Sequence, residues 1–358
     1  MPQFPDLLVH AIPAFILLII LEVIFAVKTQ RELYEVKDAA TSIALGLGNL
    51  VMGIFTKTII LLVFYFLYQF RIFTIPWNAW WAWLLIIFAD DLSYYLFHRT
   101  SHSVRFFWAS HVVHHSSEKY NLAAALRQTW TGNITGSFLF WSWMPLIGFE
   151  PAMILTMQSV SLLYQFWIHT ESIQKMPKWF EAFFNTPSHH RVHHGTDLIY
   201  LDKSHAGIFI IWDKMFGTFQ EEKFHPKYGL TKNVHSFNPV FVAFHEWRNI
   251  FLDLRKSKTW KQAFHYIFDS PGWSHDASSK TTRQLRKEKE NNFKLGLEGF
   301  FTDQQFLYNG TQTPTFWEFG FMAEKTLWKN YSFFINFENF TDTRQSNYKP
   351  VVNGSHNN

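Results

Sequence analysis

Three short segments of the chain carry histidines at the spacing of one helical face. They read HRTSH at 98–102, HVVHH at 111–115 and HRVHH at 190–194. Side chains three and four positions apart lie on the same side of a helix, so each segment can present two or three imidazoles together. The residues concerned are His98, His102, His111, His114, His115, His190, His193 and His194. Because imidazole binds iron, zinc, copper and nickel, the spacing predicts a metal site.

The number of these histidines indicates more than one metal ion. Eight nitrogen ligands exceed what a single tetrahedral zinc ion needs, and they suit two ions that share a pocket and each keep an open position for oxygen or substrate. His169, at the end of an apolar segment that faces the boxes, is expected to be a further ligand. The chain has no cysteine, which excludes thiolate and iron–sulfur sites. We interpret the other histidines as surface or filler residues: His10, His205, His225, His235, His245, His265, His275 and His356.

Apolar segments before and between these histidines predict membrane helices. Residues 7–27 are long enough to span a bilayer, and they lack the basic start and the cleavage site of a signal peptide. Residues 39–70 could form an interfacial segment followed by one span, or a tight hairpin, and 77–97 indicate a further span with a tryptophan belt. Two apolar runs in 134–168, broken by proline and glycine, predict two helices joined by a turn.

These elements predict an all-α fold, a multi-pass membrane bundle that carries a histidine-rich domain on its cytosolic face. If the charged segment 28–38 is cytosolic, the basic loops lie inside, as the positive-inside rule requires. The same arrangement places 98–130 and 169–194 on one side of the membrane, and these two stretches hold 10 of the 18 histidines. We therefore divide the chain into N-terminal membrane helices at 1–75 and a catalytic domain at 76–275.

The remaining segments differ in character. Residues 206–219 predict either an amphipathic helix at the membrane interface or a helix packed on the catalytic domain, and 236–275 indicate interfacial helices. The charged stretch 276–292 is typical of a linker, and 293–358 contains the partial alternation of a β-hairpin. This short tail is similar to strands near the end of outer-membrane TonB-dependent receptors but cannot close a barrel. We interpret it as a fused fragment, with an ordinary β-rich tail as the alternative.

Composition limits the partners of this chain. Aromatic residues make up 19% of the sequence, and the net charge is +4 without a cluster of Lys and Arg. A nucleic-acid partner is therefore not expected. A mild basic excess together with long aromatic segments fits a protein that lies against anionic lipid.

The three boxes resemble those of the fatty acid hydroxylase/sterol desaturase superfamily of membrane di-iron oxygenases. The segments at 108–128, 162–171, 185–195 and 206–222 are similar to its alkylglycerol monooxygenase branch, which cleaves ether lipids. The resemblance covers roughly residues 40–275. By position, it implies that His169 and His189 join the eight box histidines as iron ligands.

The resemblance implies two iron ions that use O2 to hydroxylate a lipid C–H bond. In the alkylglycerol branch this carbon lies next to the ether oxygen, the product collapses to a fatty aldehyde, and tetrahydrobiopterin is the electron donor. Ser103 stands where that branch usually has Glu. This difference weakens the expectation of the same substrate and reductant, but it leaves the expected metal site unchanged. The alternatives are a sterol or fatty acid desaturase or hydroxylase, and a non-catalytic membrane metal-binding protein. The membrane would be the inner membrane of a bacterium or the endoplasmic reticulum of a eukaryote.

Charged residues near the boxes are candidates for positioning roles. Carboxylates usually orient metal-bound histidines, and the candidates are Asp90, Asp91, Glu118, Glu171, Asp197 and Asp202. The arginines nearest the boxes are Arg99, Arg127 and Arg191. Their guanidinium groups could hold a phosphate or carboxylate, or could serve as interfacial anchors.

Overall fold

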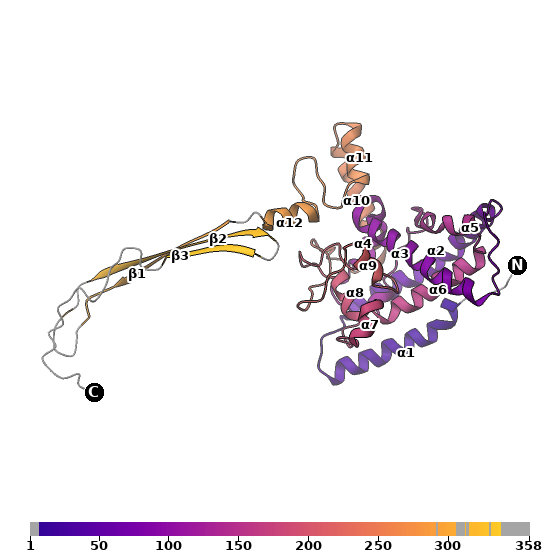
Figure 1. The fold of residues 1–358 in the computed structure, drawn as a ribbon, viewed down its shortest axis with the longest axis horizontal. Coiled ribbons are helices and arrows are strands. Elements are labelled where there is room, and N and C mark those ends of the chain that lie inside the picture. Colours follow the sequence, from indigo (N-terminus) through magenta and orange to yellow (C-terminus); the bar gives the residue numbers. More distant parts are fainter. Residues whose placement is uncertain (1–6, 291–292, 306–311, 313–314, 329–330, 338–358) are drawn as a thin grey trace. The chain divides into compact units, whose positions relative to one another are not determined.

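The computed structural model describes residues 7–290, 293–305, 312, 315–328 and 331–337. The chain divides into two units, Met1–Thr282 and Arg283–Asn358 (Figure 1). The first unit is helical, as predicted. Its helices are α1 (Leu7–Lys28), α2 (Val36–Tyr68), α3 (Trp80–Ser103), α4 (Arg105–His115), α5 (Trp143–Ile147), α6 (Pro151–Trp167), α7 (Lys178–Phe183), α8 (Pro187–His193), α9 (Ile211–Met215), α10 (Pro239–Lys256) and α11 (Trp260–Phe268), with two 3-10 helices, η1 (Ala124–Leu126) and η2 (Ser137–Trp141).

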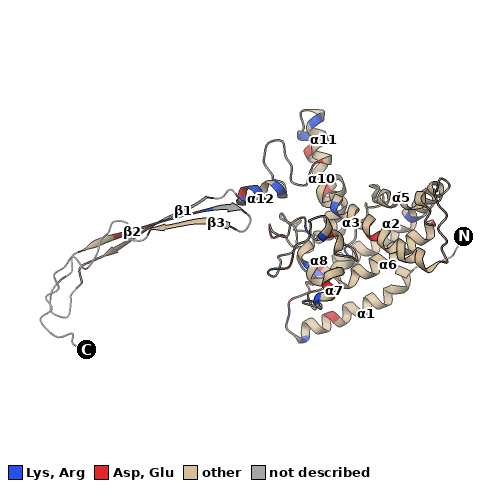
Figure 2. Ribbon diagram, viewed as in Figure 1, with Lys and Arg blue, Asp and Glu red and all other residues tan. Residues whose placement is uncertain are grey.

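Two of the described helices, α1 and α2, are long and apolar enough to cross a membrane. Figure 2 shows α1 as an almost uncharged helix with one acidic turn, which is at Glu22. The segments 77–97 and 134–168 were predicted as further spans. They form helices, but these are not both long enough and apolar enough to count as membrane-spanning by the criterion that α1 and α2 meet. The second of these segments folds as η2 and α5 followed by α6, which agrees with two helical parts joined by a turn.

Helix α2 is continuous from Val36 to Tyr68, so residues 39–70 do not form the hairpin considered above. Its glycines explain the interruption in the apolar pattern. A Cβ atom on Gly46 would lie 2.7 Å from the carbonyl oxygen of Leu126, and one on Gly48 would lie 2.3 Å from the ring of Trp130. The two glycines therefore allow α2 to pack closely on the segment that follows the second histidine box.

The core between α2, α3, α5 and α6 is apolar. It contains Phe64, Ile86, Met144, Met153 and Ile154, all fully buried. This packing holds α3 in place, and α3 carries the first histidine box on its last turns.

One residue with extended backbone, Val104, separates α3 from α4, so the first two boxes lie on neighbouring helices. The start of α4 is held by Arg105, which forms ion pairs of 2.8 Å with Glu246 and 2.9 Å with Asp253 of α10. The start of the helix that carries the second box is therefore held by the turn at Val104 and by α10.

The second unit contains α12 (Thr282–Glu290) and an antiparallel sheet in the order β1 (Phe293–Thr302), β2 (Phe316–Trp328) and β3 (Tyr331–Phe337). Strands β2 and β3 agree with the predicted hairpin, with Phe321 opposite Phe337. Within the stretch 276–292, predicted as a linker from its charged composition, residues Thr282–Glu290 form the helix α12. Residues 338–358 of the predicted tail lie outside the described residues.

Candidate metal centre

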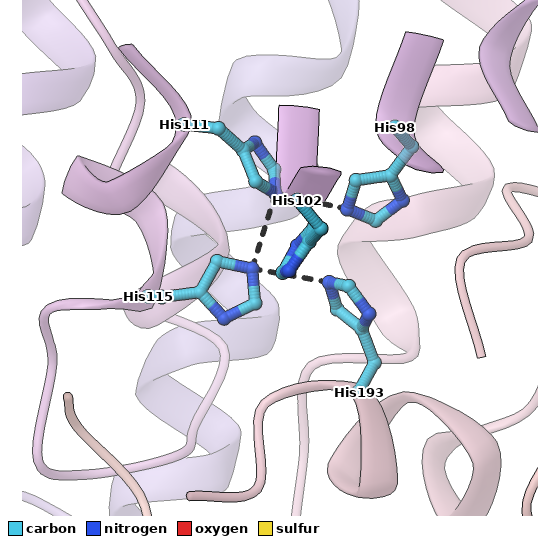
Figure 3. Close-up of side chains that lie close together, drawn as sticks. All are labelled: His98, His102, His111, His115 and His193. Carbon is cyan, nitrogen blue, oxygen red and sulfur yellow. Dashed lines mark hydrogen bonds between the residues drawn. The ribbon is translucent and has the colours of Figure 1, made fainter. Parts of the chain in front are cut away.

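Five imidazoles converge in a first group, which we call the five-histidine cluster (Figure 3). One ring nitrogen of each lies within 4.8 Å of the others. The Nε2 atom of His111 is 2.9 Å from Nε2 of His98 and 3.1 Å from Nε2 of His115, which is 3.1 Å from Nε2 of His193. The members are His98 and His102 of α3, His111 and His115 of α4, and His193 of α8.

Four further imidazoles form the four-histidine cluster, made of His114, His169, His190 and His194. The Nε2 atom of His169 is 3.1 Å from Nε2 of His114 and 3.0 Å from Nε2 of His190. Nε2 of His194 lies 3.2 Å from Nε2 of His190. The two clusters are adjacent, because the ring of His194 stacks on that of His115 with 4.3 Å between ring centres.

The spacing HxxHH explains how one helix serves both clusters. In α4, His111 and His115 join the five-histidine cluster while His114 joins the other. In α8 the roles are exchanged, since His190 joins the four-histidine cluster and His193 the five-histidine cluster. A residue at i+3 is rotated from the i and i+4 pair by part of a turn, so it can contribute to the other cluster where a neighbouring segment brings further histidines.

The structure brings together nine of the ten histidines predicted as ligands. His189 is the exception, since its ring packs on Phe219 at 5.4 Å and lies in neither cluster. His205, interpreted as a surface or filler residue, is buried beside the five-histidine cluster, with its ring 5.0 Å from that of His102. No helical spacing connects His205 to a box, so the sequence contains no signal for this position.

The clustered histidines are suited to hold metal ions at neutral pH. Burial, followed by repulsion from neighbouring imidazoles, lowers the pKa of His111 and His193 well below the ordinary value. Burial lowers the pKa of His114 to about 4. Because metal ligation needs neutral imidazole, protons compete weakly at these sites. The Nε2 atoms also converge without an acidic group between them, a donor set that fits two cations.

Contacts on the outer ring nitrogens orient several of these rings. Nδ1 of His98 lies 2.7 Å from the carbonyl oxygen of His205, and Nδ1 of His193 lies 3.0 Å from that of Lys203. Nδ1 of His169 is 2.7 Å from the carbonyl oxygen of Gln165. When Nδ1 donates its proton to a carbonyl, the Nε2 lone pair is left for a metal ion.

Two buried aspartates hold the loop that supplies the carbonyls of residues 203 and 205. Asp213 accepts hydrogen bonds of 2.8 Å from the backbone N–H groups of His205 and Ala206. Asp91 accepts from the N–H groups of Ile208 and Phe209 at 2.6 and 2.9 Å. The segment 206–219 is therefore packed on the helical unit, which agrees with the second of the two interpretations of this segment.

The other predicted carboxylates have varied partners. Asp202 lies 3.5 Å from Nδ1 of His102, and Asp90 accepts a hydrogen bond of 2.7 Å from the Trp141 indole. Glu171 pairs with His225, and Asp197 accepts from the backbone of Lys227. For Glu118, nothing in the structure explains a role at the clusters.

Two of the predicted arginines are engaged within the protein. Arg127 is buried and pairs with Asp38 at 3.0 Å. Arg191 donates to both carboxylate oxygens of Glu222 at 2.8 Å. These guanidinium groups therefore bind protein carboxylates and are not placed to receive a phosphate from outside. Arg99 donates to the Tyr95 hydroxyl at 3.3 Å.

We expect the metal-free protein to lose stability as the pH falls below about 6.5, the ordinary pKa of histidine. Below this pH the histidines of the unfolded chain bind protons, whereas the buried imidazoles of the folded protein stay neutral. Each such histidine lowers the free energy of unfolding by up to about 1.4 kcal/mol per pH unit. For His114 this loss continues down to its folded pKa of about 4.

The measurement is thermal unfolding of chelator-treated protein in detergent, from neutral pH down to about pH 5. A midpoint that does not change over this interval would contradict the low pKa of the buried histidines.

The clusters lie in a part of the chain that matches a protein-family model. Residues 83–218 match the family model described as fatty acid hydroxylase, and this range contains all nine clustered histidines. We refer to residues 83–218, the range similar to this family, as the hydroxylase domain. Helices α1 and α2 precede the hydroxylase domain, and α10 and α11 follow it.

Curated relatives extend the similarity beyond the hydroxylase domain. The chain is 39% identical over 274 residues to alkylglycerol monooxygenase of Homo sapiens, which covers 76% of this chain and 61% of the relative. The enzyme of the same name from Danio rerio is 36% identical over 274 residues, covering 76% and 61%. That from Xenopus tropicalis is 35% identical over 270 residues, covering 75% and 60%. The chain thus spans about three fifths of the length of these relatives. No solved structure matches it.

Proposed function

We propose that this protein is a membrane di-iron oxygenase that hydroxylates a lipid C–H bond with O2. The observation that carries the proposal is the pair of adjacent, buried histidine clusters in the hydroxylase domain. Nine imidazoles exceed the needs of one zinc ion, and an all-nitrogen set that leaves coordination positions open is typical of metals that activate oxygen.

The proposed roles of the chain's residues follow from their contacts. The five-histidine cluster would hold one iron and the four-histidine cluster the other. Iron held there would activate O2, the oxidant needed to break an unactivated C–H bond. The protein supplies position: buried rings exclude water, and the carbonyls of residues 203 and 205 keep the lone pairs of His193 and His98 directed inward.

An alkylglycerol ether is the proposed substrate, supported by the names of the relatives. Hydroxylation of the carbon next to the ether oxygen consumes O2, two electrons and two protons. One oxygen atom enters the lipid and the other leaves as water. The resulting hemiacetal opens to a fatty aldehyde and a glycerol derivative. Tetrahydrobiopterin is the proposed electron donor.

A membrane location is proposed from the surface of the first unit. Large apolar side chains are exposed along α1 and α2, including Leu17, Ile54 and Leu62. Helices α10 and α11 add exposed aromatics and several cations, visible in Figure 2, which suit the surface of an anionic bilayer. The membrane would be the inner membrane in a bacterium or the endoplasmic reticulum in a eukaryote. Protein that washes off membranes at alkaline pH would contradict this location.

The test is an assay of the detergent-solubilised protein loaded with iron, with O2, tetrahydrobiopterin and a labelled alkylglycerol. Fatty aldehyde is expected, and it should disappear in a His111→Ala variant. Two bound irons without aldehyde would reject the ether substrate and direct the search to sterols and fatty acids. This arm of the test matters because Ser103 stands where the alkylglycerol branch usually has Glu. A protein that does not bind iron would reject the oxygenase itself.

A further inference from the structure

The backbone carbonyls that orient rings of the five-histidine cluster come from within the hydroxylase domain. The carbonyls that meet His98 and His193 belong to residues 205 and 203. Asp213 holds that loop through two backbone N–H groups. All of these residues lie in the range 83–218.

The surroundings of the four-histidine cluster reach outside the domain, first to Glu22 of α1. This side chain is buried, with 5% of its surface exposed, inside a helix that is otherwise largely apolar. Its Oε1 accepts hydrogen bonds from the hydroxyls of Thr170 and, at 3.2 Å, Ser172. Thr170 directly follows His169, a member of the cluster. Glu22 therefore ties α1 to the segment that carries this ligand.

The second oxygen of Glu22 ties down another part of the site. Oε2 accepts from the Tyr34 hydroxyl at 2.5 Å and from the backbone N–H of Leu122 at 2.8 Å. Leu122 lies in the loop that leaves the second histidine box, seven residues after His115. One carboxylate thus accepts from four donors, which is a way to keep a charged group stable when it is buried.

A second carboxylate from outside the domain is Asp38, at the start of α2. Its Oδ1 accepts from Arg127 Nη1 at 3.0 Å, and its Oδ2 accepts from the Ser117 hydroxyl. The carbonyl oxygen of the same Arg127 lies 3.3 Å from Nδ1 of His114. The chain Asp38–Arg127–His114 therefore fixes the backbone that faces a ligand of the four-histidine cluster.

We infer that Glu22 and Asp38 are positioning residues for the metal site of the four-histidine cluster, so that α1 and α2 are parts of the metal centre as well as of the proposed membrane anchor. The inference rests on the proposed di-iron centre. It assigns the two ions different supports, because positioning carboxylates from the two helices that precede the hydroxylase domain act on the four-histidine site.

The experiment measures iron bound per chain, and its affinity, in purified full-length variants. Wild-type protein should hold two irons. Glu22→Ala and Asp38→Asn should each weaken one iron by about 10- to 100-fold, the usual effect of removing a group that orients a ligand. The other iron should stay bound as in the wild type.

Glu150→Gln is the matched control for these variants. Glu150 is also buried, also accepts from a tyrosine, Tyr65 at 2.5 Å, and caps α6 at the end far from His169. Its replacement should leave both irons in place. A similar loss of iron in this variant would indicate a general loss of folding and would overturn the inference.

A double-mutant comparison identifies which iron is affected. Adding Glu22→Ala to His190→Ala should cause little further loss, because both changes act on one site, whereas adding it to His98→Ala should weaken the remaining iron by about the same 10- to 100-fold. Glu22→Ala and Asp38→Asn proteins that hold two irons at wild-type affinity would overturn this inference alone. Wild-type protein without two irons would overturn the proposed function and the inference with it.

Discussion

On the proposed function, replacing His190 with alanine is expected to remove one iron per chain and to lower lipid hydroxylation by more than about 100-fold, beyond the usual cost of losing an outer contact. His190 is 1% exposed, and its Nε2 lies 3.0 Å from Nε2 of His169 and 3.2 Å from Nε2 of His194. Burial and the neighbouring imidazoles hold its pKa well below the ordinary value, so it is a neutral ligand at pH 7. The measurements are iron content and the rate of product formation.

His189→Ala is the matched control, because the same substitution is made at a histidine that directly precedes His190. Its ring faces Phe219 and lies outside both clusters. This variant should keep two irons and most of the activity. If His189→Ala lost an iron while His190→Ala kept both, the division of the histidines between ligands and fillers would be wrong.

Replacing Arg191 with methionine is expected to destabilise the folded protein by about 3–5 kcal/mol, the cost of removing one partner of a buried ion pair. The Arg191 side chain is 2% exposed and bonds both carboxylate oxygens of Glu222, itself 11% exposed. It also donates to the carbonyls of Thr170, Ile173 and Gln174. Without it, a buried carboxylate and three carbonyls lose their donor. The measurement is the midpoint of thermal unfolding in one detergent.

Lys175→Ala provides the comparison for this effect. Lys175 pairs with Glu221 at 3.4 Å, but both side chains are more than half exposed. An exposed pair contributes about 0–1 kcal/mol, so the midpoint should barely change. Equal effects of the two substitutions would show that burial of the Arg191 pair does not determine its contribution.

The sequence by itself determined the chemistry of the centre. Spacings of three and four residues place the box histidines on single helical faces, and this follows from helix geometry before any tertiary contact forms. Eight of the nine clustered histidines belong to these boxes, and the ninth, His169, was predicted from its place at the end of an apolar segment. The long apolar segments likewise predicted α1 and the helical character of the first unit, but not that α2 is one continuous helix.

The tertiary structure decided how those histidines are divided and what holds them. His114 is separated from His115 because the two meet different distant residues. Nε2 of His114 lies 3.1 Å from that of His169, whereas Nε2 of His115 lies 3.1 Å from that of His193. Spacing within one helix does not encode these long-range contacts. The positions of His205 and Asp213 depend on a loop that folds back onto α3.

Glu22 and Asp38 illustrate the same division between sequence and tertiary structure. In the sequence each is one acid near a long apolar segment, separated from its partners at Thr170 and Arg127 by 148 and 89 residues. Only packing brings such distant groups together, because a buried carboxylate is stable only where several donors converge on it. Helix periodicity therefore determines which residues can bind metal, and long-range packing determines which of them share an ion.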